Sequence, residues 1–95
     1  MPDQTARKIP RPFSLHWGGG QIVEEASFDG LHHEPSVQLL EFDDGSLSVR
    51  FCYYNHSGRF QRSPLMLGGD EIAQMRDALS QAPRLRSLLR EMLED

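Results

Sequence analysis

The chain has 95 residues, and ten Lys and Arg residues stand against fourteen Asp and Glu residues, which gives a net charge of −4. This length fits one domain with a modest core, so we expect a homodimer, and the acidic total argues against nucleic acid as a partner. No apolar run approaches the roughly 20 residues of a membrane span, and the single cysteine excludes an intramolecular disulfide and fits a reducing cytoplasm.

The N-terminal residues predict an arm in front of the domain. Residues 1–11 combine prolines with scattered charge, and they have no apolar segment typical of a secretory signal. We therefore expect a flexible arm over 1–11 and a single domain over 12–95.

A hairpin is predicted to open the domain, over residues 13–28. Its first strand rests on the alternation of Phe13, Leu15 and Trp17. The three glycines at 18–20 predict a tight reversal before a second strand over 21–28. A phosphate-cradling role for these glycines is disfavoured, because no Lys-Ser or Lys-Thr pair follows them.

The next loop contains His32, His33 and Glu34, which invites a metal hypothesis. Neighbouring residues on a strand point to opposite faces, so the two imidazoles seldom reach one ion. A site would need ligands such as His16 or His56 from elsewhere in the chain. We therefore predict no metal and no cofactor.

Three further strands are predicted, over 36–42, 46–54 and 59–67. The turns between them are Asp43-Asp44-Gly45 and Asn55-His56-Ser57-Gly58, and Pro64 implies an edge or a bulge in the last strand. Alternation along the middle strand predicts that Val49 and Phe51 are buried and that Arg50 is exposed on the opposite side.

The last third of the chain predicts a helix after Gly68-Gly69, with Asp70 as its cap. Pro83 should kink or split this helix. Its second part carries an apolar stripe that is either core or a dimer seam, formed by Leu85, Leu88, Leu89, Met92 and Leu93. Strands first and helix last indicate an α+β fold, an antiparallel sheet of four or more strands with the helix against one face.

Charge is unevenly distributed along the chain. Residues 45–69 hold three Arg and no acid, whereas the remaining residues hold seven basic and fourteen acidic groups. The acid-free segment carries its arginines beside Phe51, Tyr53, Tyr54 and Phe60. Guanidinium groups suit phosphates and base stacking, although ordinary surface charge is an equally good interpretation.

Motifs of enzymes are absent from the sequence. It contains no GxSxG, HExxH, CxxC or Walker motif, so we predict that the protein is not an enzyme. Cys52 has no His or Lys beside it in the sequence that would lower its pKa, which favours a structural or exposed thiol.

The central residues resemble the positive cofactor four family of transcriptional coactivators and its bacterial relatives. Residues 37–42, the acidic turn and residues 47–54 look like the two middle strands of that family, and 58–67 looks like its next turn and strand. The junction at 67–72 sits where that family passes from strand to helix. The resemblance covers roughly residues 28–93.

This resemblance implies a curved four-stranded antiparallel sheet with a following helix, a homodimer, and binding of single-stranded DNA across the sheet. The positions that it assigns to binding are Arg50, Tyr54, Arg59, Phe60 and Arg62. This chain departs from the family with an acidic turn at Asp43-Asp44, and the hairpin at 13–28 has no counterpart.

Three functions follow from these observations. The first is a non-enzymatic protein that binds single-stranded DNA or RNA, with the role of a transcription cofactor. The second is a dimeric protein-interaction module of the same fold that does not bind nucleic acid, which the acidic balance favours. The third and least favoured is a small metal-dependent enzyme that uses the four histidines.

Overall fold

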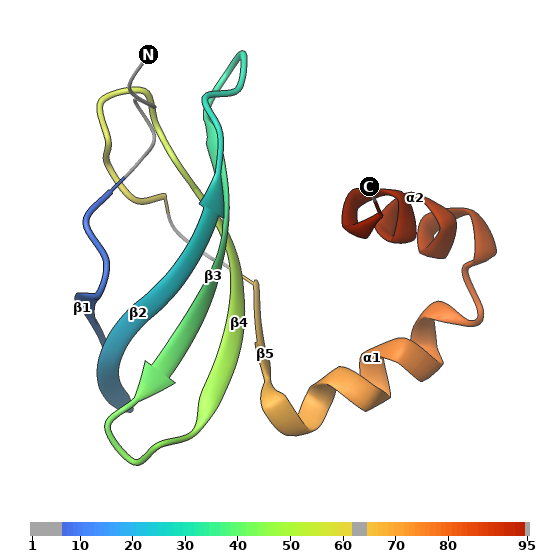
Figure 1. Ribbon diagram of the computed structural model, residues 1–95, viewed down its shortest axis with the longest axis horizontal. Coiled ribbons are helices and arrows are strands. Elements are labelled where there is room, and N and C mark those ends of the chain that lie inside the picture. The colour runs from blue at the N-terminus through green and yellow to red at the C-terminus, as the bar shows by residue number, and fades with distance from the viewer. Residues whose placement is uncertain (1–6, 62–64, 95) are drawn as a thin grey trace.

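The computed structural model describes residues 7–61 and 65–94, which form one antiparallel sheet and a helical C-terminal arm (Figure 1). The strands lie in the sheet in the order of the sequence. Their bounds are β1 Arg11–Leu15, β2 Gly18–Ser27, β3 Glu34–Phe42, β4 Leu47–Tyr54 and β5 Leu65–Gly68. The predicted α+β class is therefore confirmed. The predicted N-terminal arm falls largely on residues 1–6, outside the described residues.

The first hairpin reverses at a different place from the one predicted. Leu15 pairs with Gly18, so the turn consists of His16 and Trp17, and the three glycines begin β2 instead of forming the turn. Gly20 has a packing reason for its place in the strand. A Cβ atom there would lie 2.1 Å from the carbonyl oxygen of Glu41 on β3, so any side chain would push the two strands apart.

The other turns follow their sequence signals. Gly45 and Gly58 adopt positive φ angles of 89° and 84°, which glycine reaches without strain. β3 begins at Glu34, two residues before the predicted start. Of the strand predicted over 59–67, the described residues show a single bridge between Tyr54 and Phe60, and 65–67 belong to β5. Pro64 and its expected bulge lie outside the described residues.

The helical arm begins with a short 3-10 turn, η1 (Gly69–Glu71), and continues as α1 (Ile72–Leu79) and α2 (Pro83–Leu93). The split at Pro83 is confirmed, because the proline starts α2. The predicted cap is wrong: the Glu71 carboxylate, and not Asp70, accepts a hydrogen bond from the Gly68 amide at 2.8 Å.

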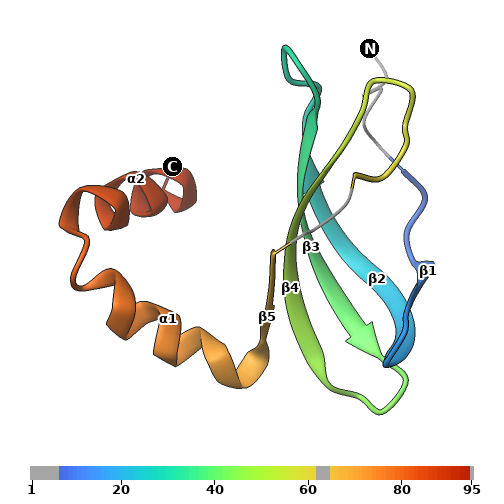
Figure 2. The same ribbon diagram turned by 180° about the vertical axis from the view of Figure 1, so that it is seen from behind.

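The helices do not pack against the sheet as predicted. In Figures 1 and 2 the arm leaves β5 and extends away from the strands, and no residue of η1, α1 or α2 is buried. The apolar stripe of α2 is therefore uncovered in the single chain. Leu88, Met92 and Leu93 are 62%, 69% and 86% exposed.

The sheet is curved, and its two faces differ in an unexpected way. We call the face that carries the buried cluster of Phe13, Ile22 and Leu40 the inner face. Arg50 also points to this inner face and is 5% exposed, so the predicted orientation of β4 is inverted. Phe51 lies on the opposite, outer face and is 37% exposed, and Val49 there is half-buried. The prediction failed because it assigned the apolar side of β4 to the core.

The outer face is a continuous apolar surface made by three neighbouring strands. The register places Leu39 beside Val49, and Val49 beside Leu67, on adjacent strands. Its apolar residues are Val37, Leu39, Leu47, Val49, Phe51, Tyr53, Leu65 and Leu67. Within the described residues no helix covers this surface.

Candidate nucleic-acid interface

The inner face holds a polar network centred on Glu25. Arg11 on β1 donates to both carboxylate oxygens of Glu25, at 2.9 and 3.1 Å. Ser36 and Gln38 on β3 donate to the same carboxylate at 2.7 and 2.8 Å. The Glu25 side chain is only 5% exposed, so these four hydrogen bonds replace nearly all of its contact with water.

The network controls the ionisation of its members. Burial raises the pKa of Glu25, but the hydrogen bonds from Arg11, Gln38 and Ser36 outweigh this effect and lower it to about 2. The hydrogen bond to Glu25 in turn raises the pKa of Arg11, against the opposing effect of burial. The pair therefore remains a carboxylate and a guanidinium, joined by a two-pronged contact.

Tyr54 belongs to this network more than to the surface. Its hydroxyl oxygen accepts hydrogen bonds from Arg11 at 3.1 Å and from Gln38 at 2.9 Å. The guanidinium carbon of Arg7 lies 3.8 Å from the centre of its ring, and the ring is edge-on to that of Phe60. Tyr54 is 7% exposed, so its ring is not open for a base to stack on it.

Arg50 is a buried cation on the inner face. Its Nε donates to the side-chain oxygen of Gln38 at 2.8 Å, and its guanidinium lies 4.7 Å from the ring of Phe60 and 5.9 Å from that of Phe13. Buried cations are normally paired with an anion. Among the described residues, Arg50 forms no ion pair.

A pocket of about 260 Å³ opens beside Arg50, between β1 and β4. Arg11 and Arg50 contribute two guanidinium groups to its wall. Apart from Ser14, the remaining wall is aromatic or aliphatic and includes Phe13, Ile22, Tyr54 and Phe60. The guanidinium of Arg50 beside these rings can accommodate a phosphate group together with a flat apolar group such as a nucleobase, whereas Arg11 is already paired with Glu25.

The structure brings together three of the five predicted binding residues. Arg50, Tyr54 and Phe60 line the same pocket, whereas Arg59 is exposed in the turn and does not line it. Arg62 lies outside the described residues. Sequence reasoning missed Arg11 and Phe13, because nothing in their local pattern indicates that β1 folds back beside β4.

Cys52 is buried on the inner face, and burial raises the pKa of its thiol above the ordinary value. The thiol therefore stays protonated and unreactive at neutral pH. Of the two alternatives left open by the sequence, a structural and an exposed thiol, the first is correct.

The histidine loop brings different groups together from those in the sequence motif. His33 packs on the ring of Tyr53, at 4.7 Å between centroids, while Arg7 pairs with Glu34. His56 lies near Asp29 and Glu34, with all three ligand atoms within 4.8 Å. Its Nδ1 contacts Asp29 at 3.0 Å and its Nε2 contacts the Leu31 carbonyl oxygen at 3.2 Å, so both ring nitrogens have protein partners.

No helix in the described part of the chain is long and apolar enough to cross a membrane. Comparison of the chain with protein-family models, with curated proteins and with solved structures finds no match. The resemblance to the positive cofactor four family therefore stays a prediction that rests on the residues quoted for it.

Proposed function

We propose that the protein binds single-stranded DNA or RNA without enzymatic activity, and that the pocket beside Arg50 is the centre of the binding surface. The observation that carries this proposal is the buried guanidinium of Arg50, which has no anionic partner among the described residues. A phosphate group of a nucleic acid would supply the missing anion, while Arg11 in the same pocket keeps Glu25 as its partner.

Phe60 is the residue that we expect to stack on a base. Its ring is 37% exposed and lies over Arg50, whereas Tyr54 is covered and supports the pocket from behind. Stacking on an aromatic ring does not depend on base identity, so sequence preference should be small. Single strands are favoured over duplex because a paired base cannot leave its stack to enter the pocket.

The functional unit that we propose is a homodimer. The outer face and the stripe of α2 expose apolar side chains that one chain cannot cover, because its helical arm extends away from the sheet. A second copy offers both an equivalent sheet and an equivalent helical stripe. Pairing through the outer faces would leave the two inner faces free for ligand.

Sedimentation at micromolar concentration tests the dimer directly. The expected mass is about twice the 10.8 kDa of one chain. A Phe51→Glu variant should shift the protein to the single-chain mass, because a carboxylate on the outer face would be buried without a partner. Leu31→Glu is the matched control, because it also replaces an apolar side chain by a carboxylate but lies 88% exposed in the loop between β2 and β3. A single-chain mass for the unchanged protein would refute the dimer.

A second candidate is a dimeric interaction module without a nucleic-acid ligand. The acidic turn at Asp43-Asp44 favours it, since this turn would repel phosphates. A role as a transcription cofactor and a place in the cytoplasm are implied only by the family resemblance and by the single thiol. Both candidates predict the dimer, so only a ligand titration separates them.

Fluorescence anisotropy with labelled oligothymidine of about twenty nucleotides, at about 20 mM salt, is the deciding experiment. Saturable binding is expected, with a log–log salt slope of roughly −2 if three arginines of one subunit contact phosphates. No saturable change at about 50 µM protein would remove the nucleic-acid candidate and leave the interaction module.

The variant Phe60→Leu sharpens this titration. It should weaken binding by about 1–3 kcal/mol if one base stacks on the ring. Phe28→Leu is its matched control, because Phe28 is 62% exposed and does not line the pocket. Equal affinities for the two variants would show that the strand does not use the pocket.

A further inference from the structure

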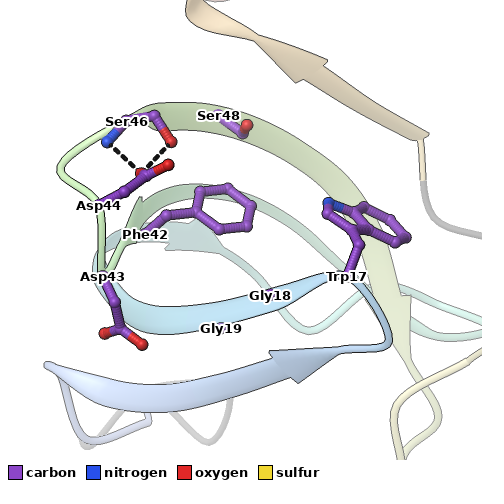
Figure 3. A pocket seen from close by; sticks show the side chains of 8 residues that line it. All are labelled: Trp17, Gly18, Gly19, Phe42, Asp43, Asp44, Ser46 and Ser48. Atoms are coloured by element: carbon purple, nitrogen blue, oxygen red, sulfur yellow. Dashed lines mark hydrogen bonds between the residues drawn. The ribbon is translucent and has the colours of Figure 1, made fainter.

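A second hollow of about 400 Å³ lies at the end of the sheet where β3 turns into β4 (Figure 3). We call it the acidic hollow. Its lining residues are Trp17, Gly18, Gly19, Phe42, Asp43, Asp44, Ser46 and Ser48. It contains two aromatic side chains, two carboxylates and two hydroxyls, and none of its lining residues is basic. Its chemistry is the opposite of that of the pocket beside Arg50.

The aromatic part of the hollow is open to a ligand. Trp17 is 62% exposed although it is the largest apolar side chain of the protein, and Figure 3 shows its indole nitrogen pointing toward the hollow. The ring of Phe42 stands next to Gly18, where a Cβ atom would make an ordinary contact with it at 3.7 Å. The missing side chain at Gly18 leaves the ring accessible.

The acidic part of the hollow is fixed in place. The backbone amide and the hydroxyl of Ser46 both donate to Oδ1 of Asp44, at 2.9 and 2.6 Å. Both bonds from Ser46 go to Oδ1 of Asp44, so neither of them occupies Oδ2. The bonds from Ser46 lower the pKa of Asp44, so its carboxylate is ionised at neutral pH. The side chain of Asp43 points away from the Phe42 ring (Figure 3).

We propose that the acidic hollow binds an arginine side chain of a partner polypeptide. A guanidinium group is flat and cationic, so it can lie against an aromatic ring while it donates hydrogen bonds to a carboxylate. The indole N–H of Trp17 would donate to a backbone carbonyl of the same polypeptide, and the hydroxyls of Ser46 and Ser48 would bind its polar groups. This site is independent of the proposed nucleic-acid pocket, because Asp44 would repel phosphate.

Trp17 is the only tryptophan of the chain, so its fluorescence reports on this hollow alone. The probe is a short acetylated and amidated Gly-Arg-Gly peptide, and the matched probe replaces arginine by citrulline, which has the same shape without the charge. Saturable quenching or a spectral shift is expected, with the arginine peptide binding roughly tenfold more tightly than the citrulline peptide. Equal binding of the two peptides, or no saturation up to about 20 mM, would overturn the proposal.

Two variants locate the effect on one carboxylate. Asp44→Asn keeps an oxygen that can accept the bonds from Ser46 but removes the charge, so the preference for arginine over citrulline should fall to nearly one. Glu41→Gln removes the same charge from an exposed residue near the turn that does not line the hollow, and it should keep the preference. An equal loss in both variants would show that overall charge, not the hollow, attracts the peptide.

Sedimentation of Asp44→Asn tests whether the arginine in the hollow comes from a separate partner or from a second copy of this chain. An unchanged mass is expected for a site that binds a separate partner. A change to the single-chain mass would show that the hollow holds an arginine of a second copy, and it would overturn the assignment to a partner polypeptide.

Discussion

The two faces of the sheet differ in which residues they bury: the inner face buries polar side chains, and the outer face exposes apolar ones. On the inner face, polar and charged groups such as Gln38 and Arg50 are 1% and 5% exposed. On the outer face of the same strands, Val37 and Phe51 are 40% and 37% exposed. An isolated sheet with one wet face normally buries its apolar side and exposes its polar side.

The difference shows what makes burial of polar groups tolerable. The inner face is covered because β1 and β2 fold over it, and each polar group there meets a partner from another strand. Among the described residues no buried side-chain nitrogen or oxygen lacks a hydrogen bond. The outer face has no such cover in one chain, so its apolar surface is a contact area for a second copy, as we propose. Polarity alone therefore does not identify the core of this sheet.

The strongest test of the inner face is removal of its central carboxylate. Glu25→Ala should lower the free energy of unfolding by about 2–4 kcal/mol, because Arg11 would lose its anion and Gln38 and Ser36 an acceptor. Urea unfolding measures this loss. Glu24→Ala is the matched control, since the neighbouring Glu24 is exposed, and a similar small change in both variants would contradict the network.

Acid should weaken the inner face through the same group. The folded-state pKa of Glu25 is about 2, below its ordinary value of 4.5, so the folded protein holds its proton less tightly than the unfolded chain does. The contribution to stability is therefore complete above pH 4.5 and is lost as the pH falls toward about 2. Urea midpoints across this range should fall less steeply in Glu25→Gln than in the unchanged protein. Parallel curves would show that other carboxylates dominate acid unfolding.

Arg50→Ala and Phe51→Ala compare the two faces at neighbouring positions. Arg50→Ala should cost about 1.5–3 kcal/mol, because it removes the charged donor to Gln38 from a buried site. Phe51→Ala should cost about 1–2 kcal/mol in a single chain, because its ring is only partly buried there. Raising the protein concentration should increase the cost of Phe51→Ala alone, because dimerisation buries its ring. Urea unfolding at two concentrations is the measurement, and a loss below about 0.5 kcal/mol for Arg50→Ala would refute its burial.

Local patterns were sufficient to predict most of the strands and the turns at Gly45 and Gly58, but not the first turn, the full strand expected over 59–67 or the faces. Period-two alternation placed β4, and Asp-Gly chemistry placed the turn at Gly45, since both depend on neighbouring residues only. The inward orientation of Arg50 depends on Gln38 and Phe13, which come from other strands. The place of Gly20 in a strand likewise depends on the Glu41 carbonyl, a contact that no local pattern contains.

The candidate site was only partly predictable from the sequence. The acid-free segment identified Arg50 and Phe60, but Tyr54 was expected to stack on bases and is instead covered by Arg7 and bonded to Arg11. The second cation of the pocket, Arg11, comes from the start of β1, far away in the sequence. Its role was not predictable, because its partner Glu25 is identified only by the pairing of β1, β2 and β3.

The smallest expected effect on stability belongs to Arg59, in the turn that follows β4. Its side chain is exposed, while its backbone closes the turn through hydrogen bonds with Asn55. Arg59→Ala should therefore change the free energy of unfolding by less than about 0.5 kcal/mol. If the proposed function is correct, it should weaken oligothymidine binding equally for all sequences and make the salt slope shallower by about 0.7. Arg76→Ala removes the same charge from α1 and should leave the slope unchanged. Equal slopes for both variants would mean that Arg59 makes no phosphate contact.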